Sequence, residues 1–122
     1  QQEKPEDFVI STGITTTVRD MAKMAFGEAG IEIEFRGEGA NEKGYVVNCS
    51  NSKYQVNKGK AVVAIDPTYY RPTEVDLLIG DSSKAREKLG WEPRSNLKQL
   101  VKEMVHSDLQ TFKLSQERKY FV

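Results

Sequence analysis

The stretch Asp66-Pro-Thr-Tyr-Tyr-Arg-Pro-Thr-Glu-Val-Asp-Leu-Leu-Ile-Gly-Asp81 runs directly into Ser82-Ser-Lys-Ala-Arg-Glu-Lys-Leu-Gly-Trp-Glu-Pro93. It places an arginine before a proline, a carboxylate three residues later, a short apolar run, and then a compact segment of helix-forming residues. We expect a helix over residues 82–89, because Asp81 or Ser82 can cap its start and Gly90 can adopt the left-handed conformation after its last turn. Pro93 prevents the helix from continuing. The rest of the chain is expected to support and pack around this stretch.

The residues before this stretch predict a strand, a helix and a second strand. Phe8-Val-Ile10 is a short apolar run of the kind found in buried strands. Apolar residues at helical spacing follow from Val18 to Glu28, with Thr17 and Asp20 placed to cap the first turn. Residues 31–36 then alternate apolar and charged side chains, as in a strand with one buried face. The order predicts a βαβ unit whose two strands are parallel.

Residues 37–60 are polar and rich in glycine and asparagine, so only a loop or short hairpin is expected there. Residues 61–65 are a strand, and a last helix capped by Ser95 or Asn96 carries an apolar stripe from Leu97 to Phe112. The predicted fold is α/β, with a small partly parallel sheet and about three helices. We expect one domain over residues 1–114, near the lower size limit for an enzyme, and a frayed tail over residues 115–122.

Composition excludes several classes of protein. Eighteen basic and eighteen acidic side chains cancel, which argues against a nucleic-acid or anionic membrane partner. No apolar run is long enough to span a membrane, and the polar N-terminal residues do not resemble a signal peptide, so a cytoplasmic protein is expected. The single cysteine, Cys49, has no partner at metal-ligand spacing, so no metal site is predicted.

The sequence lacks two signatures of dinucleotide-dependent enzymes. No glycine-rich Gly-x-Gly-x-x-Gly turn follows a strand, so no cofactor is expected to bind by that route. Tyr69, Tyr70 and Tyr120 each lack a lysine four residues later, and His106 has no visible partner, so no catalytic residue is predicted.

Arg71 and Glu74 are the candidate binding residues. Pro72 favours extended geometry at Arg71, which suits a guanidinium that binds a phosphate with two hydrogen bonds. Glu74 is placed to accept hydrogen bonds from sugar hydroxyls. From the residues alone, a simple surface ion pair between the two is the more common arrangement.

Weaker candidates lie elsewhere in the sequence. The loop from Gly37 to Gly44 is able to approach a ligand through backbone amides and Lys43, although glycines between strands more often mark turns. Arg19 is expected to be solvated or to form an ion pair between elements, with a lesser chance of facing a nucleotide. Tyr69 and Tyr70 are able to stack on a base, although aromatic residues at a strand end usually belong to the core.

The sequence resembles the GDP-mannose 4,6-dehydratase family of extended short-chain dehydrogenases/reductases. The most specific motif is Asp66-Pro-x-Tyr-x-Arg-Pro-x-Glu-Val75 with Leu78-x-Gly-Asp81, whereas Leu89-Gly-Trp-x-Pro93 is shared by many nucleotide-sugar epimerases, dehydratases and reductases. Residues 11–13, 17–20, 31–37 and 42–44 contribute further similarity.

The resemblance implies a function as well as a fold. Family members convert GDP-mannose to GDP-4-keto-6-deoxymannose and water, with NADP and the catalytic residues on an N-terminal Rossmann domain. The chain is similar to their C-terminal, substrate-binding part, with the Rossmann core absent. Arg71 would then bind the diphosphate of GDP-mannose and Glu74 a ribose hydroxyl.

The same resemblance implies further properties of such a part. It would be inactive alone, bind no NADP, and belong to a lyase that is a homo-oligomer when full-length. It would also expose an apolar face that normally docks on the Rossmann domain. Two alternatives stay open: the same part of another nucleotide-sugar epimerase or reductase, and a stand-alone module that binds a nucleotide sugar or a protein.

Overall fold

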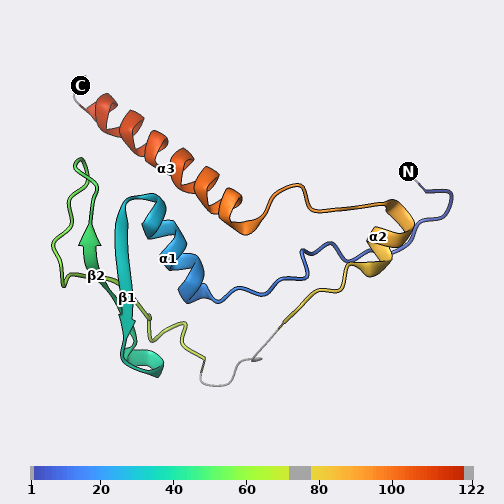
Figure 1. Ribbon diagram of the computed structural model, residues 1–122, viewed down its shortest axis with the longest axis horizontal. Coiled ribbons are helices and arrows are strands. Elements are labelled where there is room, and N and C mark those ends of the chain that lie inside the picture. The colour runs from blue at the N-terminus through green and yellow to red at the C-terminus, as the bar shows by residue number, and fades with distance from the viewer. Residues whose placement is uncertain (1, 72–77, 120–122) are drawn as a thin grey trace.

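The computed structural model describes residues 2–71 and 78–119, with only the backbone for residues 116–119. These residues form a small α/β fold with three helices, which confirms that part of the prediction. The elements are α1 (Val18–Glu28), β1 (Ile31–Arg36), the short 3-10 helix η1 (Gly39–Asn41), β2 (Lys43–Cys49), β3 (Ala61–Ala64), α2 (Ser83–Leu89) and α3 (Leu97–Lys119). Figure 1 shows the sheet, α1 and α3 at one end of the molecule and α2 with the N-terminal segment at the other.

The strands form one antiparallel sheet in the order β1-β2-β3. The predicted βαβ unit is therefore wrong: β1 pairs antiparallel with β2, and residues 8–10 form no strand. The physical reason is that the chain from residue 37 onward returns as a hairpin and occupies the edge of β1. β2 lies within the segment for which the sequence predicted only a loop or hairpin.

The main core lies between the sheet and α1. Ile31, Ile33 and Val46 are buried, and partly buried side chains from α1, including Phe26, pack against them. The alternation predicted for residues 31–36 is observed, because Ile31 and Ile33 face inward while Glu32 and Glu34 are exposed. α1 also contacts α3, which adds the buried Val101.

The helix ends match the sequence signals. Thr17 Oγ1 accepts a hydrogen bond from the Asp20 backbone N–H at 3.0 Å. Gly90 ends α2 with a φ of 61°, and the Trp91 N–H donates to the Ala85 carbonyl at 3.3 Å. Asn96 caps α3 reciprocally with Gln99, its Oδ1 accepting from the Gln99 N–H and its N–H donating to Gln99 Oε1.

α3 continues to Lys119, beyond the limit of 114 predicted for the domain. None of the described helices is long and apolar enough to cross a membrane.

Candidate functional site

A turn after β3 carries Arg71. Pro67 occupies a position that suits its fixed φ, and the Asp66 carbonyl accepts a hydrogen bond from the Tyr69 N–H at 3.1 Å. The Asp66 side chain accepts a second one from the Thr68 N–H at 2.9 Å. These bonds fix the turn immediately before Arg71, whose side chain is exposed. The order of the turn reduces the entropy that a ligand would have to remove on binding there.

Tyr70, the residue before Arg71, approaches η1 through its hydroxyl group. Gly39 has a φ of 54°, and a Cβ atom added to it would lie 3.2 Å from the Tyr70 hydroxyl oxygen. Gly37 has a φ of 96°, and its Cβ would lie 2.7 Å from the Asn41 carbonyl oxygen. Both glycines therefore allow backbone positions that a larger residue would disturb. The structure brings two sequence candidates together, since the Gly37–Gly44 loop supports the segment that ends in Arg71.

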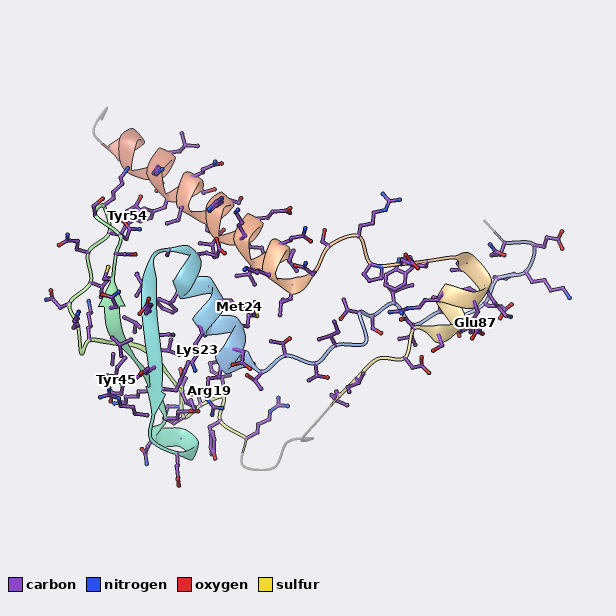
Figure 2. All side chains as sticks on the ribbon, viewed as in Figure 1. Arg19, Lys23, Met24, Tyr45, Tyr54 and Glu87 are labelled. Carbon is purple, nitrogen blue, oxygen red and sulfur yellow. The ribbon has the colours of Figure 1, made fainter. Side chains whose placement is uncertain are left out.

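Arg19 is held by an ion pair beside the same loop. Its Nη2 lies 2.6 Å from Glu42 Oε1, its Nε donates to the same oxygen at 2.8 Å, and its guanidinium lies 5.8 Å from the centre of the Phe35 ring. Figure 2 shows Arg19 at the end of α1 nearest η1. The prediction of an ion pair between elements is confirmed. No sequence signal identified Glu42 as the partner, because the two residues are far apart in the chain.

A hollow of about 370 Å³ lies over this ion pair. It is lined by Thr17, Val18, Arg19, Ala22, Phe35, Glu42, Val63, Ala64 and Ile65. A larger hollow of about 580 Å³ lies on the other side of the start of α1, against residues 93–100. Its lining is mostly apolar, and Arg71 does not contribute to it.

The remaining candidate residues are spread over different parts of the chain. Glu74 lies outside the described residues, so its position relative to Arg71 is not tested. Tyr69 is 80% exposed and therefore does not belong to the core. His106 and Lys43 are exposed on α3 and β2. Within residues 2–71 and 78–119, no three His, Cys, Asp or Glu side chains form a group able to hold a metal ion.

Comparison with known proteins decides the family. The family model described as GDP-mannose 4,6 dehydratase matches residues 1–104. The chain belongs to this dehydratase family. It is 48% identical over 109 residues to the GDP-mannose 4,6-dehydratase of Sinorhizobium fredii and 48% identical over 111 residues to that of Vibrio cholerae, covering 28% and 30% of those proteins. The human GDP-mannose 4,6 dehydratase is 44% identical over 110 residues, which are 27% of its length.

The match to the dehydratase family includes every element of the candidate site. The Arg19–Glu42 ion pair, η1 and the turn that ends in Arg71 all fall within residues 1–104, as does Glu74. The match covers about 90% of this chain, whereas the chain spans about 30% of the length of the curated relatives. The site therefore belongs to the part of the chain for which the similarity to dehydratases is established.

Proposed function

We propose that this chain supplies the GDP-mannose-binding portion of a GDP-mannose 4,6-dehydratase. The complete reaction would convert GDP-mannose to GDP-4-keto-6-deoxymannose and water. The observation that carries the proposal is the exposed Arg71 at the end of a hydrogen-bonded turn supported by η1, inside the region that matches the family.

Arg71 would bind the diphosphate. A guanidinium presents a planar set of N–H donors that matches two phosphate oxygens, and a fixed backbone keeps that set in one direction. Glu74 would accept a hydrogen bond from a ribose hydroxyl.

Tyr69 would stack on the guanine base. Its ring is 80% exposed, while the neighbouring Tyr70 hydroxyl approaches Gly39. Tyr69 and Arg71 lie two residues apart in the sequence and would contact different parts of one nucleotide.

The cofactor and the catalytic residues would come from other parts of the enzyme. NADP would supply oxidation at C4 and return of the hydride at C6, but this sequence has no dinucleotide-binding turn to hold it. We assign no residue of this chain to NADP and expect the chain alone to be inactive. Membership of the short-chain dehydrogenase/reductase group, a cytoplasmic location and a homo-oligomer of the full-length enzyme belong to the same proposal.

Calorimetric titration of the chain with GDP-mannose, GDP and guanosine tests the binding role. We expect GDP and GDP-mannose to bind more tightly than guanosine, because only they carry the diphosphate. Arg71→Ala removes charge-assisted hydrogen bonds worth about 1.5–3 kcal/mol, so the Kd should rise roughly 10- to 100-fold. Arg94→Ala, which removes an exposed arginine from the connection between α2 and α3, is the matched control and should leave the Kd unchanged. Equal weakening by both substitutions would refute a specific role for Arg71.

A further inference from the structure

Glu42 connects η1 to α1. Its Oε1 lies 2.6 Å from Arg19 Nη2 and accepts a hydrogen bond from Arg19 Nε at 2.8 Å. The Glu42 backbone N–H donates to the Gly39 carbonyl at 3.2 Å, which closes the single turn of η1. The residue that ends η1 is therefore also the residue that pairs with α1. Movement of η1 away from α1 would break this ion pair.

The surroundings of the ion pair restrict its geometry. The Glu42 side chain is only 19% exposed, whereas Glu34 is 61% exposed in its ion pair with Arg36. Salt screens a partly buried pair less than a fully exposed one. The Arg19 guanidinium also lies 5.8 Å from the centre of the Phe35 ring, a second contact that limits its motion. The pair thus joins α1, β1 and η1.

Tyr70 connects η1 to Arg71. A Cβ atom on Gly39 would lie 3.2 Å from the Tyr70 hydroxyl oxygen, so the hydroxyl lies against the η1 backbone. Tyr70 is 40% exposed and the preceding Tyr69 is 80% exposed, so Tyr70 is the one of the two that packs against the protein. Because Tyr70 and Arg71 share a planar peptide unit, a shift of Tyr70 moves the backbone from which the Arg71 side chain starts.

The turn after β3 and the contact with η1 act on successive parts of the chain. The Asp66 carbonyl accepts from the Tyr69 N–H, and the Asp66 side chain accepts from the Thr68 N–H. These bonds act on residues 66–69, whereas the contact with η1 acts on residue 70. Together they determine the direction of the backbone where it reaches Arg71.

We propose that Glu42 is a positioning residue for the contact between Arg71 and a nucleoside diphosphate. Glu42 acts through η1 and Tyr70 and does not touch the nucleotide. The inference rests on the proposed function, because it concerns the affinity that Arg71 contributes. A guanidinium whose backbone is already held in place loses less entropy when it binds a phosphate, so positioning raises this affinity.

The sign of the effect separates positioning from simple electrostatics. Glu42→Gln removes a negative charge and releases Arg19 from its carboxylate, and both changes raise the positive potential near η1. A diphosphate is an anion, so charge alone would tighten the binding of GDP or leave it unchanged. Positioning has the opposite consequence, because GDP binds more weakly once η1 is released from α1.

The test is a double-mutant cycle in which four proteins are titrated calorimetrically with GDP: the unaltered chain, Glu42→Gln, Arg71→Ala and the double variant. We expect Glu42→Gln to raise the Kd about threefold to tenfold, but by less than about twofold when Arg71 is already replaced by alanine. Glu34→Gln removes the same charge from an ion pair within β1, so it is the matched control and should leave the Kd unchanged. Urea denaturation checks that each variant is folded.

Gly39→Ala tests the contact between η1 and Tyr70 separately. The added Cβ crowds the Tyr70 hydroxyl, so the Kd for GDP should rise by about threefold or more. Removal of the hydroxyl in the double variant Gly39→Ala/Tyr70→Phe should restore the Kd. Gly90→Ala is the matched control, because Gly90 has a φ of 61°, similar to the 54° of Gly39, but nothing within 4 Å of its added Cβ.

Three results would overturn the inference while Arg71→Ala still weakens GDP binding. Glu42→Gln would bind GDP as tightly as the unaltered chain or more tightly, or it would weaken binding equally with and without Arg71. Alternatively, Tyr70→Phe would fail to relieve the effect of Gly39→Ala. Failure of the proposed function looks different, because the unaltered chain would then not bind GDP or Arg71→Ala would leave its Kd unchanged.

Discussion

The two arginines of the candidate site lie on different elements. Arg19, on α1, is paired with Glu42 and lies near the Phe35 ring, and Arg71 is exposed after the hydrogen-bonded turn that follows β3. The sequence identified both as candidates, and it gave the correct type of partner for Arg19 without identifying that partner. The contact between Arg19 and Glu42 depends on the hairpin in which β2 pairs with β1. Local sequence patterns carry little information about which strands pair in this way.

Glu42→Gln tests how much the Arg19 ion pair contributes to stability. The pair is partly exposed, so its loss should lower the free energy of unfolding by less than about 1 kcal/mol, measured by urea denaturation. The difference should shrink in 1 M salt, which screens charges beyond roughly 3 Å. Glu34→Gln, in a more exposed ion pair with Arg36, is the control and should have a smaller effect. A salt-independent loss of several kcal/mol would show that Glu42 acts through something other than charge.

Gly37 is predicted to be important for the stability of the loop around η1, which Tyr70 approaches. Gly37→Ala introduces a Cβ at 2.7 Å from the Asn41 carbonyl oxygen in a residue with a φ of 96°, so it should destabilise the protein by about 1–3 kcal/mol. Gly27→Ala is the matched control. Its added Cβ meets nothing within 4 Å in α1, and it should stabilise the protein by about 0.5–1 kcal/mol. Thermal denaturation of both variants gives the comparison, and equal effects of the same sign would contradict it.

At the scale of elements, the sequence was most informative where local chemistry determines the structure. The observed bounds of α1 and α2 agree closely with those predicted from their capping residues and glycines. This is because Thr17 and Gly90 each interact with the end of their own helix. β2 was predicted only as a loop or hairpin because its partners lie on other strands and its sequence includes Gly44 and Asn48. The strand is stabilised by pairing with both β1 and β3, which makes it the central strand of the sheet.

The N-terminal segment is attached to α2 by charge, and this attachment should depend on pH. Hydrogen bonds from Lys88 and Lys84 lower the pKa of Glu6 from its ordinary value of 4.5 to about 2. The native state therefore favours the ionised carboxylate. The stabilisation is fully present above pH 4.5 and is lost as the pH falls through about 2.

Comparison of the unaltered chain with Glu6→Gln measures this effect. The stability difference between the two should be constant above about pH 5 and should decrease toward zero near pH 2. Glu3→Gln is the control, because Glu3 takes part in no ion pair found among the described residues. A difference that grows on acidification would have the wrong sign for a carboxylate held by lysines.

At the scale of the whole molecule, the sheet end and the α2 end have different properties. The sheet end has its own core of Ile31, Ile33 and Val46 and carries the candidate nucleotide site. The α2 end exposes apolar side chains of two segments, at Val9, Ile10, Leu78 and Ile79. The sequence predicted these segments as apolar but placed residues 8–10 beside β1, because the hairpin partner of β1 was not identifiable.

The most direct measurement replaces the matched region of the Vibrio cholerae relative with this chain and assays the loss of water from GDP-mannose in the presence of NADP. The account predicts an active chimera in which Arg71→Ala raises KM roughly 10- to 100-fold with a smaller change in kcat, while Arg94→Ala leaves both unchanged. A folded chimera that lacks activity, or one in which Arg71→Ala leaves KM unchanged, would contradict the assignment of this chain as the GDP-mannose-binding portion.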